Sequence, residues 1–288
     1  RRLLGDDAAA PVFIETIRKR GYRTVAELDF TADDIHRVSH WDGGSPFRGL
    51  LPFDEAHAPV FYGRDEATRK LANAAQAQID NGLALLLLLG PSGSGKTPLV
   101  RAGLFPAMAR ARAGPGAALL AMTTFDVADQ GEQTLFTALA GAMLDLQWDA
   151  TYAFPDENAV ALGKRLERDC ASVAEQMNAA LAPHRAGMRF GIFIDRFEAL
   201  FNANRVSEPE RVAFLATLGQ LARGSACLIV LACRNDFYPS IANLPLFIEV
   251  KRHGGHVDLA PPSFSDRADD PQAGRGGATD LRRRSRHA

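Results

Sequence analysis

A glycine-rich loop that follows an apolar run carries the clearest chemistry in this sequence. The run 83–89 leads directly into Gly90-Pro-Ser-Gly-Ser-Gly-Lys96-Thr97, which matches G-x-x-x-x-G-K-[ST] in full. Backbone N–H groups of such a loop surround a polyphosphate, the lysine bridges its outer phosphates, and the hydroxyl is a ligand for Mg²⁺. The alternative, a flexible glycine–serine loop, does not explain why an apolar strand, the loop and a helix follow in this order. The predicted nucleotide-binding residues are Gly90, Pro91, Ser92, Gly93, Ser94, Gly95, Lys96 and Thr97.

Glycines and one proline determine what the backbone of this loop can do. Gly90, Gly93 and Gly95 permit positive φ and a close approach of the backbone to phosphate. Pro98 has no N–H, although the amide at this position ordinarily donates toward the α-phosphate. Proline is compatible with the first turn of a helix, so the fold tolerates it. The lost donor weakens nucleotide binding by about 1.5–3 kcal/mol if nothing replaces it.

A phosphate loop also needs an acid on the metal side, at the end of a neighbouring strand. Asp195 directly follows the apolar run 188–194 and is the predicted second metal ligand, beside Thr97. The alternative is that Asp195 caps the N-terminus of a helix.

Two residues are candidates for chemistry on the γ-phosphate, and each has a second interpretation. Glu198 either orients the attacking water or is a solvated carboxylate at the start of a helix, and we weigh the two equally. Arg234, after the next apolar run, either senses the γ-phosphate or pairs with Asp236, and we favour the sensor role. The predicted catalytic residues are therefore Lys96, Glu198 and Arg234.

The elements that must position these residues alternate along the chain. Apolar runs at 83–89, 117–124, 188–194 and 227–232 predict strands, and helices are expected from 67 onward and at 95–112, 133–146, 159–181 and 208–221. This alternation predicts an α/β fold with a parallel sheet and helices on both faces, the three-layer arrangement of a P-loop NTPase.

The composition excludes several classes of protein. The formal net charge of the 288 residues is −1, so no global basic field favours nucleic acid. Cys170, Cys227 and Cys233 fit neither a disulfide framework nor a zinc site, which suits a reducing cytosol. His253 and His256 flank a glycine pair and indicate a turn instead of a metal site. Every apolar run is shorter than the ~18 residues of a membrane span, so we expect a cytoplasmic protein.

The first 28 residues predict a β-hairpin, because alternating runs at 12–17 and 22–26 flank a basic turn. The stretch GDD…P-x-FIET-x-RKRGYR resembles the C-terminal wing of an OmpR-type winged-helix DNA-binding domain, especially its CadC-like branch. The resemblance implies that Arg18, Lys19, Arg20 and Arg23 contact DNA phosphates or a minor groove. The alternative, which we favour for this chain alone, is a remnant that does not bind DNA by itself.

The rest of the chain is expected to fall into three parts. Residues 29–44 are polar and end in a glycine pair, which predicts a linker, and residues 45–263 form the NTPase domain. Residues 264–288 are a low-complexity tail that cannot form a packed core, from either a disordered end or a shifted reading frame. Because the chain opens on arginine, we also expect it to be either a piece of a longer protein or a gene model with an uncertain start.

Several motifs in order resemble the novel STAND NTPases of bacteria, which are signalling ATPases. The motifs are SPFRGLLPF, FYGR, GPSGSGK-x-x-LVRAGL, FIDRFEALF, RNDFY and GHVDLAPPS. The resemblance implies that Gly63 and Arg64 flank an adenine pocket, that Asp195 is the Walker B acid and that Arg234 is the first sensor. Two residues depart from the family pattern: Pro98 replaces a small polar residue, and Arg196 replaces an uncharged polar one.

Together these features predict a switch that binds ATP and Mg²⁺, hydrolyses ATP slowly and belongs to a signal-responsive transcription regulator. Its expected partners are the nucleotide, DNA through the wing of the intact protein, and other protein chains or further copies of itself on activation. Two alternatives stay open: a nucleotide-binding module that does not hydrolyse ATP and acts through DNA or protein contact, and a truncated, inactive fragment.

Overall fold

The chain divides into two units, Arg1–Gly44 and Ser45–Ala288. A computed structural model describes residues 12, 14–17, 21–25, 51–111, 116–202 and 204–259. The predicted linker 29–44 and tail 264–288 therefore lie outside the described residues.

The first unit contains the predicted hairpin. Strands β1 (Ile14–Ile17) and β2 (Gly21–Thr24) pair antiparallel, with Ile14 opposite Thr24 and Ile17 opposite Gly21. The basic turn at 18–20 and the side chain of Arg23 lie outside the described residues, so the DNA contacts expected there stay a prediction.

The second unit is built on a five-stranded parallel sheet. Its strands are β3 (Leu85–Leu89), β4 (Ala118–Asp126), β7 (Met188–Asp195), β8 (Cys227–Cys233) and β9 (His256–Asp258), in the order β4-β7-β8-β3-β9. The predicted parallel sheet is thus confirmed. Strand β9 was not predicted, because only three residues after the His253 turn pair with the edge of β3.

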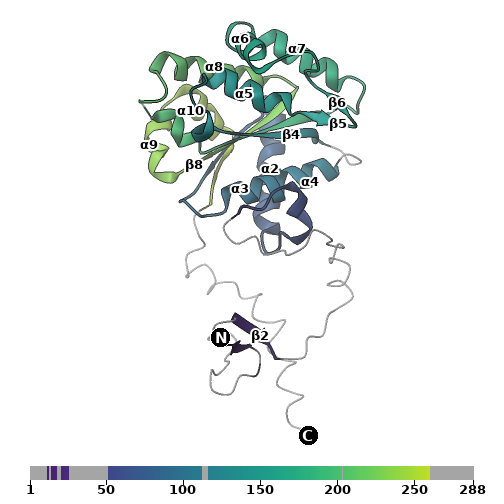
Figure 1. The fold of residues 1–288 in the computed structure, drawn as a ribbon, viewed down its shortest axis with the longest axis vertical. Helices are drawn as coiled ribbons and strands as arrows, with labels where there is room; N and C mark the ends of the chain where they lie inside the picture. The colour runs from purple at the N-terminus through teal and green to yellow at the C-terminus, as the bar shows by residue number, and fades with distance from the viewer. Residues whose placement is uncertain are drawn as a thin grey trace. The chain divides into compact units, whose positions relative to one another are not determined.

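Helices cover both faces of this sheet, as Figure 1 shows. On one face lie α2 (Asp65–Asp80), α3 (Lys96–Pro98), the π-helical segment η3 (Leu99–Leu104) and α4 (Phe105–Arg110). On the other lie α5 (Leu135–Leu144), α6 (Ala159–Arg168), α7 (Cys170–Leu181), α8 (Glu208–Arg223) and α10 (Pro245–Arg252). Shorter elements are η2 (Glu55–Val60), η5 (Val127–Asp129), β5 (Gln147–Trp148), β6 (Thr151–Tyr152), η6 (Phe197–Phe201), η7 (Asn235–Phe237) and α9 (Tyr238–Ile241). The α/β three-layer prediction is therefore confirmed.

Two predicted helices differ from the structure. The helix expected at 159–181 is broken at Asp169, whose side chain accepts a bond from the Ser172 N–H and so caps α7. The helix expected at 95–112 changes from α3 into the π-helical segment η3 and back into α4. Such π-helical turns occur often at functional sites.

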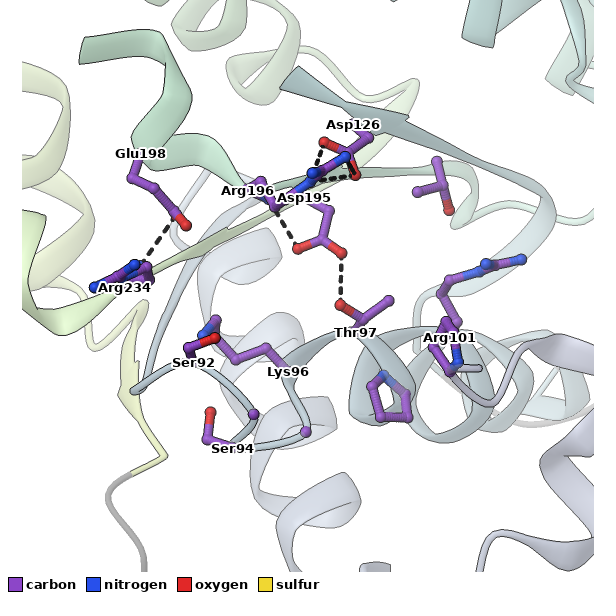
Figure 2. Close-up of a pocket in the computed structure, with 15 residues that line it drawn as sticks. Ser92, Ser94, Lys96, Thr97, Arg101, Asp126, Asp195, Arg196, Glu198 and Arg234 are labelled. Atoms are coloured by element: carbon purple, nitrogen blue, oxygen red, sulfur yellow. Dashed lines mark hydrogen bonds and ion pairs between the residues drawn. The ribbon is translucent and has the colours of Figure 1, made fainter. Parts of the chain in front are cut away.

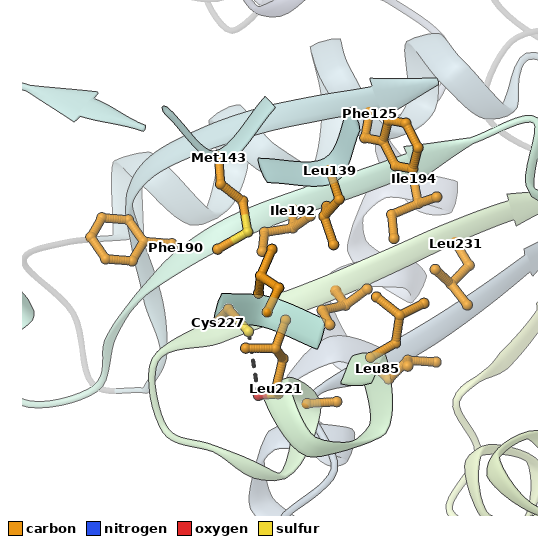
Figure 3. Packing of buried hydrophobic residues seen from close by; sticks show 14 of the residues in the cluster. Leu85, Phe125, Leu139, Met143, Phe190, Ile192, Ile194, Leu221, Cys227 and Leu231 are labelled. Atoms are coloured by element: carbon orange, nitrogen blue, oxygen red, sulfur yellow. Dashed lines mark hydrogen bonds between the residues drawn. The ribbon is translucent and has the colours of Figure 1, made fainter. Parts of the chain in front are cut away.

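The core explains why the strand sequences are apolar without alternation. Leu85, Leu87 and Leu89 of β3 belong to the cluster under α5–α8, whereas Leu86 and Leu88 belong to the cluster under α2 and α4. Figure 3 shows part of the first cluster. Because the sheet is buried on both faces, every position of β3 and β8 is apolar.

Candidate functional site

The sequence-predicted site residues meet at the carboxyl ends of the parallel strands. The glycine-rich loop follows β3, Asp195 ends β7, and Arg234 follows β8. The chain passes from β3 to the far edge strand β4, and β9 later adds on the other side of β3, so the loop lies where the connections change direction. Open α/β sheets bind ligands at such a point. A cavity of about 750 Å³ lies there, lined by the loop and by Thr97, Asp126, Asp195, Glu198 and Arg234 among others.

Backbone hydrogen bonds fix the conformation of the glycine-rich loop. The Ser94 N–H donates to the Pro91 carbonyl at 3.2 Å, and the Gly90 N–H donates to the Cys233 carbonyl of β8 at 3.3 Å. Gly93 and Gly95 have φ of 76° and 84°, as their role in the loop requires. Gly90 does not have positive φ, so the expectation for it was wrong. Its neighbourhood is crowded instead, because a Cβ there would lie 2.6 Å from the Ser94 hydroxyl and 3.2 Å from the Leu259 Cβ, so at least one side chain would have to shift.

The ammonium group of Lys96 lies against the backbone of this loop. Its Nζ donates to the carbonyl oxygens of Gly90 at 2.7 Å and Pro91 at 3.0 Å, and within the described part of the chain it forms no ion pair. Burial lowers the pKa of Lys96, although Glu198 and Asp195 act in the opposite direction. A half-buried cation without a paired carboxylate is stabilised by an incoming anion, so the loop fits a phosphate group.

Thr97 and Asp195 join the loop to the end of β7. The Thr97 hydroxyl donates to Asp195 Oδ2 at 2.5 Å, and the N–H of Arg196 donates to Oδ1 at 2.8 Å. Asp195 is only 9% exposed. The residue that precedes η6 as its N-cap is Arg196, so Asp195 is not the cap of this element. A buried carboxylate beside a hydroxyl is a hard oxygen donor set, which suits Mg²⁺.

Arg196 has a backbone conformation that is rare outside glycine. Its φ is 47° in the left-handed region, and such strain occurs often at functional sites. Its Nε donates to both carboxylate oxygens of Asp126 at 2.7 and 2.6 Å, and its Nη2 pairs with Asp129 at 2.6 Å. Burial raises the pKa of the Asp126 carboxyl, while bonds from Arg196 partly oppose this. Asp126 is a site residue that sequence reasoning missed, although it ends β4 as Asp195 ends β7.

Glu198 and Arg234 lie together on the other side of Lys96 from Arg101 (Figure 2). Glu198 Oε2 accepts a bond from the backbone N–H of Arg234 at 3.2 Å. The Arg234 guanidinium donates to Asp236 at 3.0 and 2.6 Å, so the pairing left open by the sequence is present. Its sensor role stays a prediction.

Gly63 and Arg64 lie at the start of α2. Gly63 has φ of 75°, and Arg64 Nη2 donates to the Ser94 carbonyl of the loop at 3.4 Å.

A second residue that the sequence did not reveal is Arg101, which lines the cavity and forms a bidentate pair with Glu55 at 3.1 and 2.9 Å. No short-range pattern connects two residues this far apart, so only the fold could show the pair.

Two further features are absent from the described ranges. These ranges contain no group of three or more His, Cys, Asp and Glu side chains that could hold a metal ion. Nor does any helix in the same ranges have the length and apolar character needed to cross a membrane.

The phosphate loop, its lysine and the buried acid of the adjacent strand define an NTPase of the P-loop class. The family described as Novel STAND NTPase 1 matches residues 46–269, and the chain belongs to this family. The predicted STAND resemblance is thereby confirmed, whereas the matched range does not include the hairpin, and its winged-helix origin stays a prediction.

Two of the solved structures that are similar to this chain share only a low sequence identity with it, and no curated protein matches it. Aeropyrum pernix ORC2 in ADPNP–ADP complexes is 14% identical, with a TM-score of 0.47 over 75% of this chain and 51% of that one. Caenorhabditis elegans PCH-2 is 17% identical, with a TM-score of 0.39 over 74% of this chain and 45% of that one. The chain therefore spans about half the length of these two proteins.

Proposed function

We propose that this chain binds ATP with Mg²⁺ and acts as a signalling switch that hydrolyses ATP slowly. The observation that carries the proposal is the half-buried Lys96 ammonium, held by two loop carbonyls and left without a carboxylate partner in the described residues. Membership of the STAND NTPase family supports a nucleoside triphosphate as the anion that completes this site.

Each part of the site has a role in this proposal. The backbone of residues 90–95 and the Lys96 ammonium bind the phosphates, and Gly63 and Arg64 border the rest of the nucleotide, as the family resemblance implies. Thr97 and Asp195 supply oxygen ligands for Mg²⁺. When bound, the ion neutralises charge on the outer phosphates.

The neighbourhood of Asp195 supports slow hydrolysis. The residue that follows it is Arg196, which carries no carboxylate and is held by Asp126. Glu198 is the candidate for orienting water, but one of its oxygens already accepts the Arg234 N–H. Arg234 already uses its Nε and Nη2 to pair with Asp236, which leaves fewer of its donors for a γ-phosphate. These engaged groups also favour the second candidate function, a nucleotide-binding module that does not turn over.

The basic hairpin of the first unit supports a DNA-binding output for the proposed switch. Its basic residues Arg18, Lys19, Arg20 and Arg23 suit phosphate contacts, so in the intact protein the nucleotide state would control a DNA-binding module and hence transcription. Protein partners or self-association on activation, and a cytoplasmic location, belong to the same proposal. The three thiols, which are free and buried, are compatible with a reducing compartment.

Affinity and turnover measured on matched variants test the nucleotide part. We expect Mg–ATP binding by calorimetry to be lost or weakened by at least about tenfold in Lys96→Ala, because a charge-assisted contact is removed. Lys70→Ala is the control, since Lys70 is an exposed cation on α2. Equal binding by Lys96→Ala and the wild type would refute the proposal. If the wild type binds Mg–ATP tightly but releases phosphate only at the background rate, the second candidate function, a nucleotide-binding module that does not hydrolyse ATP, is supported.

The DNA part has its own test. A gel shift that weakens with salt and disappears when residues 1–28 are removed would support a DNA-binding wing. A shift that survives this deletion would assign DNA binding elsewhere.

A further inference from the structure

Pro98 leaves one hydrogen-bond position beside the phosphate loop without its donor. In a phosphate loop the N–H of residue 98 points toward the α-phosphate, and Pro98 cannot supply it. The helix has Gly95 as its N-cap, so its first internal bond is the one from the Leu99 N–H to the Gly95 carbonyl at 3.0 Å. The Ser94 carbonyl lies before this N-cap and is open to a donor from outside the helix.

The donor that the structure brings to this carbonyl is Arg64. Its Nη2 lies 3.4 Å from the Ser94 oxygen, although the two residues are 30 positions apart in the sequence. Nη2 is also 3.5 Å from the point where a Cβ on Gly95 would lie, and the Pro98 ring carbon Cγ is 3.9 Å from the same point. The guanidinium and the proline ring thus border one small region of the loop, and Gly95 leaves that region open.

The charge of Arg64 is available to a ligand. Arg101, Arg196 and Arg234, which line the cavity, are each paired with a carboxylate, and Arg64 lies beside the loop without lining the cavity. Arg64 is exposed and, within the described residues, forms no ion pair. Its backbone is fixed, because its carbonyl accepts the Thr68 N–H at 2.8 Å at the start of α2. A guanidinium on a fixed backbone, with one donor on a loop carbonyl and no carboxylate partner in the described residues, suits a phosphate oxygen.

We propose that the Arg64 side chain binds the α-phosphate of the nucleotide and so replaces the amide donor that Pro98 lacks. This inference rests on the proposed function, and it changes the expected role of Arg64 from bordering the adenine to holding a phosphate. A bidentate guanidinium supplies at least as much charge-assisted bonding as one backbone N–H, so Pro98 is tolerated in the loop only together with Arg64.

A double-mutant cycle tests this dependence. Dissociation constants for adenosine, ADP and ATP are measured by calorimetry for the wild type, Arg64→Gln, Pro98→Ser and the double variant. Arg64→Gln should weaken ADP and ATP by a similar factor of about 10–100, the cost of a lost bond to a charged group. In the Pro98→Ser background, where the amide is restored, the same change should cost less than about threefold. Lys70→Gln, an equal change of charge on an exposed side chain of α2, should leave all affinities within about twofold.

The outcomes separate the inference from the proposed function. If the wild type binds nucleotide and Arg64→Gln binds as Lys70→Gln does, the inference is overturned and the proposed function stands. If Arg64→Gln lowers nucleotide affinity equally in the wild-type and Pro98→Ser backgrounds, Arg64 does not replace the amide that Pro98 lacks. If Arg64→Gln lowers the affinity for adenosine as much as that for ADP and ATP, Arg64 contacts the nucleoside and not the phosphate. If the wild type binds no nucleotide, both fall. Unfolding temperatures of all variants, and Arg64→Lys as a variant that keeps the charge and should retain part of the affinity, exclude misfolding as the cause of a loss.

Discussion

Replacing Thr97 by valine removes one hydroxyl at the junction of the loop and the sheet while keeping the shape of the side chain. In the structure this hydroxyl donates to Asp195 Oδ2 at 2.5 Å, and Asp195 is 9% exposed. The carboxylate would keep the bond from the Arg196 N–H on its other oxygen. The variant therefore leaves one oxygen of a buried charge without its donor.

The expected loss follows from that arrangement. A hydrogen bond to a charged group contributes about 1.5–3 kcal/mol. Thr97→Val should therefore lower the free energy of unfolding of the nucleotide-free protein by about 1.5–3 kcal/mol. Thr97→Ser keeps the hydroxyl and removes one methyl group, so it should lose only about 0.8 kcal/mol. If Thr97 is a ligand of Mg²⁺, the valine variant should also bind ATP equally with and without the ion.

Urea denaturation gives the first quantity, and calorimetric ATP titrations with Mg²⁺ or with EDTA give the second. A valine variant as stable as the wild type would show that the Thr97–Asp195 bond contributes nothing. If Mg²⁺ strengthens ATP binding by the valine variant as much as by the wild type, Thr97 is not a metal ligand. This result would hold whatever the stability of the variant.

Two further predictions concern packing and pH. Gly163→Ala should be less stable than Gly141→Ala by about 1–3 kcal/mol in urea, because a Cβ at 163 would lie 2.9 Å from the backbone of Thr137, whereas one at 141 makes only a 3.8 Å contact. Equal stabilities would contradict the close packing of α5 on α6. Burial raises the pKa of Cys227 from 9.0 to about 12, so the unfolded chain loses this proton first as the pH rises. The free energy of unfolding should then fall above pH 9 by about 1.4 kcal/mol per pH unit more steeply in the wild type than in Cys227→Ala, and parallel pH profiles of the two would refute it.

Most strands of the sheet could be predicted because strands that are buried on both faces consist of consecutive apolar residues. Leu86 and Leu88 face one helical layer and Leu85 and Leu87 the other, so the run has no polar position. Strand β9 gave no such signal, since His256–Asp258 is short and becomes a strand through pairing with β3. The break at Asp169 was missed because apolar residues recur at helical spacing on both sides of it.

The site could be predicted where it is local or ends a strand. Lys96 and Thr97 follow from the loop pattern, and Asp195 follows from its position after an apolar run. The same rule applied to β4 would have found Asp126. The contacts of Arg64 with Ser94 and of Arg101 with Glu55 join residues 30 and 46 positions apart, and no periodicity connects them.

The distribution of charge pairs around the loop separates binding from turnover. Lys96 donates to carbonyls and Arg64 forms no ion pair in the described residues, so an anion can reach both without breaking an existing charge pair. The two residues proposed to act on the γ-phosphate are engaged instead: Arg234 with Asp236, and Glu198 with a backbone N–H. In the proposed function, weakening these contacts would add to the barrier of turnover without adding to the cost of binding. We therefore expect the site to hold a nucleotide for longer than an efficient ATPase does, as the proposed switch requires.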